Sequence, residues 1–229
     1  MKNKIIKYLK KSLCGVLCTA MAFIPTASVF ATEYDETGAP IVTATPTPDP
    51  HTEFYDQAAS TDNIPGWPQG PKIEGESAIL VDMITGTVLY AKNADKVQYP
   101  ASITKIMTAL LAAEHLDMKD KLVMSESAAH GITISDSSSI YADTGEELTI
   151  EQAMMAVMLQ SANEMSVAVA EEVSGSVKKF TELMNWRAKL FGCKNTHFNN
   201  PNGLPDENHY TTASDMAKIA KSAWLNPLF

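Results

Sequence analysis

The sequence predicts an α+β domain in which one β-hairpin precedes a series of buried helices. Two short runs rich in β-forming residues, 77–82 and 87–91, flank a turn in which Gly86 can adopt a positive φ. Residues 106–113 are apolar on nearly every side, which is typical of a helix buried on most faces. An isolated two-stranded hairpin is rarely stable, so we expect these strands to belong to a larger antiparallel sheet that is incomplete in this chain.

The first 31 residues have the features of a secretory signal peptide. Residues 1–11 carry five lysines and no acidic residue, an apolar stretch runs from Leu13 to Ile24, and Ala31 is a small residue suited to precede cleavage. The apolar stretch is shorter than the roughly 20 residues that a membrane-spanning helix needs. We therefore expect residues 1–31 to be removed and the protein to be exported to the cell wall or periplasm.

Residues 32–72 are expected to form a disordered linker rich in proline and threonine. Seven of the twelve prolines lie in this stretch, mixed with Thr, Asp and Gly. Such a composition cannot bury much apolar surface, so an extended tether is the natural interpretation. The folded domain is then predicted to occupy residues 73–229.

Within that domain, the sequence predicts further helices after the one at 106–113. Two apolar segments rich in Met, Ala and Val cover 151–159 and 167–173. Helical spacing of apolar residues continues over 180–191, with Gly192 at the C-cap position. A last helix is expected to begin at Thr212, with Asp215 as its capping partner three residues on.

Charge and composition argue against several classes of function. The formal net charge is −9, and loss of the five lysines of the signal peptide takes it to −14. An acidic surface is poorly suited to nucleic acids, so no nucleic-acid partner is expected. Of the three cysteines only Cys193 would remain, and the five histidines show no metal-ligand spacing. We expect no disulfide, metal or cofactor.

A candidate nucleophile and base lie at the start of the first predicted helix. Ser102 follows Pro100 in the first turn, where the helix dipole favours developing negative charge. Lys105 projects from the same helix face three residues on. A buried lysine with a lowered pKa could accept the proton of a serine hydroxyl. The pattern is weak alone, and Ser176 with Lys179 is a second match that we interpret as a solvated charged segment.

A polar break supports this candidate site. Ser161 and Asn163 interrupt two apolar helical segments, 59 and 61 residues after Ser102. They can form an ordinary turn, because both residue types favour turns and caps. Together with Ser102 and Lys105, they could supply a proton-relay hydroxyl and an amide that orients the lysine.

This order of motifs resembles penicillin-binding proteins and serine β-lactamases, and several segments resemble the D-alanyl-D-alanine carboxypeptidases in particular. The resemblance runs from about Gly66 to Trp224. It implies a β-lactamase/transpeptidase-like fold with a helical subdomain. The similar segments are Ala78-Ile-Leu-Val-Asp82, Pro100-Ala-Ser-Ile-Thr-Lys-Ile-Met-Thr108, Gly145-Glu-Glu-Leu-Thr149, Thr196-His-Phe-Asn-Asn-Pro-Asn-Gly-Leu-Pro205 and Tyr210-Thr-Thr-Ala213.

The resemblance implies a role for each of the four residues. Ser102 would attack the carbonyl between two D-alanines at the end of a peptidoglycan stem peptide, and Lys105 would accept its proton. Ser161 would pass a proton to the leaving amine, and Asn163 would hold Lys105 and the acylated chain. β-Lactam antibiotics would acylate the same serine.

The chain also departs from the family pattern. Glu164 stands where the family more often has Asp, and Asn202 stands where His is common. The family's third motif, Lys-Thr-Gly, does not occur after Ser161, so we expect a C-terminally incomplete domain without a membrane-attachment segment. Two alternatives therefore remain: a non-catalytic penicillin- or peptidoglycan-binding remnant and, less favoured because no Glu-x-x-Leu-Asn run occurs, a serine β-lactamase.

Overall fold

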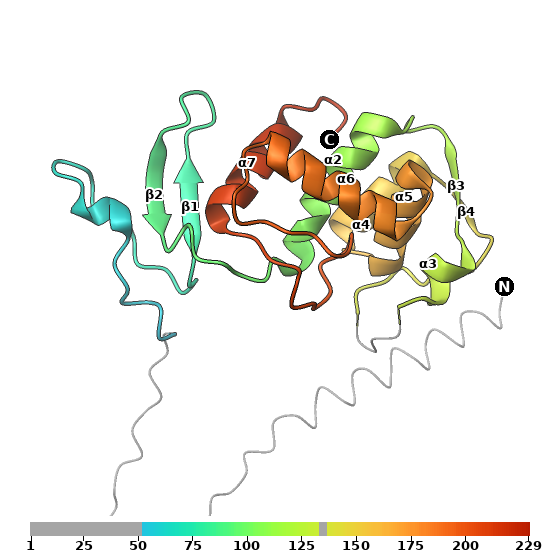
Figure 1. The fold of residues 1–229 in the computed structure, drawn as a ribbon, viewed down its shortest axis with the longest axis horizontal. Coiled ribbons are helices and arrows are strands. Elements are labelled where there is room, and N and C mark those ends of the chain that lie inside the picture. Colours follow the sequence, from blue (N-terminus) through green and yellow to red (C-terminus); the bar gives the residue numbers. More distant parts are fainter. Residues whose placement is uncertain (1–51, 133–136) are drawn as a thin grey trace, which may run out of the picture. The chain divides into compact units, whose positions relative to one another are not determined.

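The computed structural model describes residues 52–132 and 137–229 (Figure 1). The predicted signal peptide, 1–31, and the first part of the predicted linker, 32–51, lie outside the described residues. The described part is α+β, as predicted, with one β-hairpin followed in the chain by a helical region (Figure 1). None of the helices in these two ranges is long and apolar enough to cross a membrane.

The predicted hairpin is confirmed. Strands β1 (Ala78–Val81) and β2 (Val88–Lys92) pair antiparallel, with Leu80 opposite Tyr90. Gly86 has a φ of 74° in the connecting turn, and the Asp82 carboxylate accepts hydrogen bonds from the backbone of that turn. Within the described ranges β1 and β2 form a sheet of two strands only.

Residues 52–72 differ from the expected tether. Ser60–Asn63 forms a short 3-10 helix, η1, that packs against β2. The Lys92 side chain is fully buried, and its amine donates hydrogen bonds to the carbonyls of Phe54 and Ile73. The indole of Trp67 donates to the Leu89 carbonyl at 3.0 Å. Polar contacts with the hairpin thus anchor this segment, although its composition offers little apolar surface to bury.

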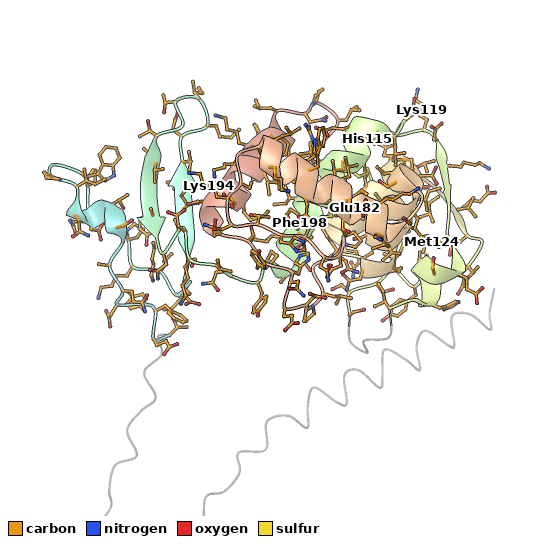
Figure 2. All side chains as sticks on the ribbon, viewed as in Figure 1. His115, Lys119, Met124, Glu182, Lys194 and Phe198 are labelled. Carbon is orange, nitrogen blue, oxygen red and sulfur yellow. The ribbon has the colours of Figure 1, made fainter. Side chains whose placement is uncertain are left out.

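Helix α2 (Lys105–His115) is the centre of the helical region. It packs against α4 (Ile150–Leu159), α5 (Asn163–Ser174), α6 (Val177–Leu190) and α7 (Ala213–Trp224). Its side chains contribute to two apolar clusters, one with α4 and α5 and the other with α6 and α7. Figure 2 labels one member of each cluster, Met124 and Phe198, well apart on the ribbon. The all-round apolar pattern of 106–113 therefore reflects burial on most faces, as predicted.

A second small sheet was not predicted. Strands β3 (Lys121–Val123) and β4 (Glu147–Thr149) pair antiparallel beside the short helix α3 (Glu126–His130). The second strand leads directly into α4, where Thr149 and Gln152 form a capping box. This box fixes the start of the helix that ends just before Ser161.

The ends of the later helices agree with the sequence patterns. Thr212 caps α7 by accepting from the Asp215 backbone N–H at 3.1 Å, as predicted. Ser176 caps α6 in the same way, through the Lys179 N–H. A helix with a buried face therefore follows Ser176, which differs from the solvated segment expected there, and its serine has a local structural role.

Candidate active site

The candidate nucleophile lies where the chain enters α2. Residues Ala101–Thr104 form a 3-10 turn, η2, that continues into the helix, and Ser102 is exposed to solvent. Ala101 has a φ of 48°, a left-handed conformation that is unfavourable for a residue with a Cβ. Such strain persists where the surrounding structure fixes it, and it often marks functional sites. Here it sets the direction in which the serine enters the first helical turn.

Lys105 is the most constrained side chain of the site. Only 3% of its surface is exposed. Its Nζ lies 3.3 Å from Ser102 Oγ, 2.7 Å from Asn163 Oδ1 and 2.7 Å from the Asn202 carbonyl oxygen. The amine is therefore held beside the serine hydroxyl by two acceptors from other segments of the chain.

The environment of Lys105 suits a base. Burial lowers the pKa of the amine from 10.5 to about 8, and the Glu164 carboxylate acts in the opposite direction. A neutral amine is consequently available in the weakly alkaline range, where it can accept a proton from a hydroxyl. Hydrogen-bond geometry and pKa together fit an activated serine nucleophile.

Two of the predicted residues lie at the entry to α5: Ser161 is in the turn before the helix, and Asn163 is its first residue. Asn163 is buried, and its amide oxygen accepts from Lys105, so the structure brings it together with Ser102 and Lys105. Ser161 has a φ of 56°, and its hydroxyl is buried without a hydrogen-bond partner among the described residues. The structure thus links three of the four predicted residues by hydrogen bonds and leaves the Ser161 hydroxyl unengaged.

The segment 199–209 contributes contacts to the site that the sequence did not predict, although part of it belongs to the family-like segment 196–205. The Asn202 carbonyl accepts from Lys105, and the Pro201 carbonyl accepts from Thr108 Oγ1 at 2.6 Å. The backbone of Gly203, with a φ of 84°, lies very close to Ala101. A Cβ on Gly203 would lie 1.8 Å from the Ala101 carbonyl oxygen. Backbone carbonyls carry no side-chain signal, so only the Asn-Pro-Asn-Gly run could have indicated them.

His209 connects this segment to Thr104, the N-cap residue of α2. Its Nε2 lies 2.8 Å from Thr104 Oγ1, and its Nδ1 accepts from the backbone N–H of Asn199 at 3.0 Å. Burial lowers the pKa of the imidazole to about 4, so the ring is neutral near neutral pH. A neutral ring that accepts at Nδ1 carries its proton on Nε2 and donates it to Thr104.

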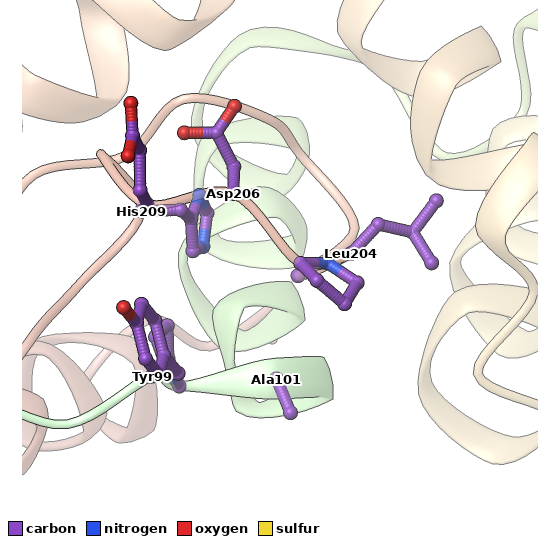
Figure 3. Close-up of a pocket in the computed structure, with 9 residues that line it drawn as sticks. Tyr99, Ala101, Leu204, Asp206 and His209 are labelled. Carbon is purple, nitrogen blue, oxygen red and sulfur yellow. The ribbon is translucent and has the colours of Figure 1, made fainter.

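A pocket of about 430 Å³ opens beside the serine-bearing turn (Figure 3). Tyr99 and Ala101 lie on one side, and Leu204, Asp206 and His209 on the other. The pocket combines apolar side chains with acceptors, which is typical of a site for a small organic group. No group of three or more potential metal ligands occurs in 52–132 or 137–229.

Comparison with known proteins agrees with this geometry. A family model described as D-alanyl-D-alanine carboxypeptidase matches residues 65–226. The chain is 46% identical over 153 residues to D-alanyl-D-alanine carboxypeptidase DacF of Bacillus subtilis, covering 65% of this chain and 38% of that protein. It is 36% identical over 166 residues to DacA of Escherichia coli, covering 69% of this chain and 40% of that one.

Solved structures show the same similarity. The D-alanyl-D-alanine carboxypeptidase DacD from Francisella tularensis superposes with a TM-score of 0.65 at 35% identity, over 69% of this chain and 39% of that one. Penicillin binding protein 5 from Haemophilus influenzae gives a TM-score of 0.63 at 35% identity, over 67% and 46%. The chain thus spans about two fifths of the length of the curated relatives described above.

Proposed function

The chain belongs to the D-alanyl-D-alanine carboxypeptidase family, and on that premise we propose that it is a serine-type carboxypeptidase that removes the terminal D-alanine from peptidoglycan stem peptides. One observation carries the proposal: a buried amine, Lys105, lies 3.3 Å from the hydroxyl of the exposed Ser102. This pairing supplies a nucleophile and its base without a metal or cofactor.

The first half of the reaction forms an acyl-enzyme. Ser102 Oγ attacks the carbonyl between the two D-alanines while its proton passes to the neutral Lys105 amine. The resulting oxyanion is stabilised by backbone donors that include the Ser102 N–H. Asn163 Oδ1 accepts a hydrogen bond from Lys105 and so keeps the amine in line with the hydroxyl.

The second half releases both products. Collapse of the tetrahedral intermediate breaks the peptide bond. Ser161 gives its hydroxyl proton to the departing D-alanine amine and takes one from protonated Lys105, which becomes neutral again. Neutral Lys105 then takes a proton from water, which attacks the Ser102 ester. Collapse of this second intermediate releases the shortened peptide and returns the proton from Lys105 to Ser102 Oγ. Among the described residues the Ser161 hydroxyl has no hydrogen-bond partner, so it is not committed to another group, and this supports the relay role.

Two further elements belong to the same proposal. β-Lactam antibiotics act as substrate mimics that acylate Ser102. The protein acts outside the cytoplasm, after export directed by the signal peptide at 1–31, since its substrate is part of the cell wall. Residues 1–31 are basic at first and then apolar, and this composition supports export.

The test is release of D-alanine from a stem peptide that ends in D-Ala-D-Ala. We expect release by the wild type and none by Ser102→Ala or Lys105→Ala. Ser176→Ala is the matched control, because Ser176 belongs to the second Ser-x-x-Lys match but caps α6. That variant should lose about 1 kcal/mol of stability and retain turnover. Release by Ser102→Ala would refute the proposal, and penicillin binding without release would favour a non-catalytic remnant.

A further inference from the structure

Asn200 lies beside the site, and the roles given above do not use it. Its side-chain oxygen, Oδ1, accepts from the backbone N–H of Gly203 at 2.7 Å and from that of Asn202 at 3.3 Å. Its Nδ2 donates to the Leu204 carbonyl at 2.9 Å. One half-buried side chain therefore makes three hydrogen bonds across the turn 200–204.

The bond to Gly203 acts on the peptide unit that holds the lysine. The Gly203 N–H and the Asn202 carbonyl belong to one planar peptide unit, in which they point in opposite directions. Asn200 Oδ1 accepts from the N–H at 2.7 Å, and the carbonyl accepts from Lys105 Nζ at 2.7 Å. Rotation of this unit would therefore break both hydrogen bonds.

Hydrogen bonding, rather than sterics, fixes the orientation of this peptide unit. The unit rotates when the ψ of Asn202 and the φ of Gly203 change together, and glycine limits φ less than any other residue. The Leu204 N–H donates to Asn202 Oδ1 at 3.1 Å and so holds the side chain of that residue, not the peptide unit. The Asn200 side chain is thus the group that fixes the N–H side of the unit.

Asn200 is itself held in place by His209. Nδ1 of this buried imidazole accepts from the Asn200 N–H at 3.3 Å and from the Asn199 N–H at 3.0 Å. Nε2 lies 2.8 Å from the hydroxyl of Thr104, the residue before Lys105. Burial lowers the pKa of the imidazole to about 4, so Nδ1 is able to accept near neutral pH. Contacts therefore run without a break from Thr104 through His209 and Asn200 back to Lys105.

From these contacts we propose that Asn200 is a positioning residue of the Ser102–Lys105 site: it fixes the peptide unit between Asn202 and Gly203, whose carbonyl holds the Lys105 amine beside the Ser102 hydroxyl. The inference rests on the proposed function, in which Lys105 is the base. Among the described residues no hydrogen bond joins Asn200 directly to Ser102 or Lys105, so it acts through this backbone group.

The substitution Asn200→Ala removes the acceptor of the Gly203 N–H. We expect the plateau rate constant of acylation by penicillin, measured well above the pKa of Lys105, to fall roughly tenfold or more, because a small displacement of a catalytic group has a large effect on rate. The pKa of Lys105 should fall as well, by about one unit, because the ammonium form loses an acceptor. Glu164, whose carboxylate raises this pKa, stays in place.

The pKa of Lys105 is measured without any need for activity. Titration of lysine labelled with ¹³C at Cε, followed by NMR and assigned by the signal lost in Lys105→Arg, gives its midpoint. A folded Asn200→Ala variant with the wild-type rate and midpoint would overturn the inference. A lower rate with an unchanged midpoint would overturn it too, since the loss would then not arise from the contact with the lysine.

Asn199→Ala is the matched control. The Asn199 side chain donates to Asp206 at 2.7 Å, and its removal leaves the Asn199 N–H free to bond to His209 as before. The rate and the Lys105 midpoint of this variant should equal those of the wild type. Losses equal to those in Asn200→Ala would show that the effect comes from the whole segment and would overturn the inference.

Asn200→Asp separates the two ends of the Asn200 amide. It keeps an acceptor for the Gly203 N–H and loses the donor to the Leu204 carbonyl. Its plateau rate should stay close to that of the wild type, and the pKa of Lys105 should not fall, because an added negative charge favours the ammonium form. A loss of rate as large as that in Asn200→Ala would contradict the role of the oxygen.

A last readout needs no substitution of Asn200, so it applies even where Asn200→Ala does not fold. The amide ¹⁵N shift of Gly203 should follow the titration of Lys105 with the same midpoint, because the two polar groups of one peptide unit polarise each other. A Gly203 shift that does not follow Lys105 would overturn the inference. A lower Lys105 midpoint in Asn200→Ala, in a protein that penicillin does not acylate, would refute the proposed function and support the positioning role.

Discussion

Lys105 is subject to two opposing influences, and the balance between them decides whether it can act as a base. Burial lowers the pKa of its amine, whereas the Glu164 carboxylate raises it. The result is an amine that titrates at about pH 8 beside a serine hydroxyl. The role of the residue therefore depends on both its burial and its neighbours.

This balance predicts the pH dependence of acylation. The neutral amine is the reactive form, and the pKa of Lys105 is lowered to about 8. The acylation rate constant should therefore rise with pH, with a midpoint near 8, and fall about tenfold for each unit below it. Stopped-flow measurement with a chromogenic β-lactam, from about two units below this midpoint to two units above it, gives the profile. A flat profile over this range would show that the base is another group.

Gly203 is predicted to be essential for local geometry. A Cβ on this residue would lie 1.8 Å from the Ala101 carbonyl oxygen, and the φ of 84° is unfavourable for alanine. Gly203→Ala should cost roughly 2–4 kcal/mol of stability and displace the turn before Ser102, with loss of acylation. Urea denaturation and penicillin labelling measure the two effects.

Gly175 provides the control for Gly203, because it has a similar φ of 74° but open space where a Cβ would lie. Gly175→Ala should cost only about 1 kcal/mol, from the left-handed backbone at the end of α5, and leave labelling intact. Equal destabilisation by the two substitutions would show that backbone conformation alone matters. The close approach to Ala101 would then have no consequence.

At the level of elements, local patterns in the sequence were sufficient for the hairpin and for most helices. The structure has the turn at Gly86, the helix cap at Thr212 and the buried helix over 106–113 where the local sequence predicts them. Strands β3 and β4 were missed because each is very short and its partner is distant in the sequence, with Leu122 opposite Leu148. Their pairing depends on tertiary contacts that no short window of sequence contains.

The same distinction applies to the site. Spacing and the apolar helix that follows made Ser102 and Lys105 candidates, and a polar break between helices did the same for Ser161 and Asn163. The pattern is weak alone, so their predicted roles depend on the family resemblance. The Asn202 carbonyl and the neutral His209 could not be recognised in this way, because one is a backbone group and the other acts through burial. The order found in 52–72 was also unpredictable from composition, since it depends on the buried Lys92 and its two backbone acceptors.

Asp215 links the start of helix α7 to residues 194–196 through hydrogen bonds. Its Oδ2 accepts from the backbone N–H groups of Lys194 and Asn195 and from Thr196 Oγ1, and its Oδ1 accepts from Lys218. Burial acts to raise the pKa of this carboxyl, but these hydrogen bonds outweigh burial and lower it. The ionised form therefore joins the start of the helix to the turn after α6.

A folded pKa below the unfolded value means that Asp215 stabilises the protein above about pH 4, and that this stability is lost as the pH falls through the folded pKa. Asp215→Asn should cost roughly 2–3 kcal/mol at about pH 7 and less at about pH 3. Denaturant titrations at the two pH values measure this difference. Asp117→Asn, at an exposed acid, is the control. An equal cost of Asp215→Asn at both pH values would show that the ionised form of Asp215 does not stabilise the fold.

At the scale of the whole described fold, an apolar groove of about 640 Å³ lies between the hairpin and α7. Val81, Met83 and Val88 line it from the hairpin, and Trp224 lines it from α7. Exposed apolar surface of this kind binds hydrophobic dyes and promotes association. Trp224→Ser should reduce binding of the dye ANS, whereas Leu190→Ser, an exposed apolar residue of α6 outside the groove, should change it little. Equal effects of the two substitutions would show that the groove binds ANS no better than the remaining surface.

The proposed activity requires that Ser102, activated by Lys105, is a nucleophile in this protein. The most direct test is the intact mass of the purified protein after incubation with a penicillin, beside a Ser102→Ala variant. We predict a mass increase of one penicillin in the wild type and none in the variant. A folded wild-type protein without an adduct, or an adduct that persists in Ser102→Ala, would show that Ser102 is not the nucleophile.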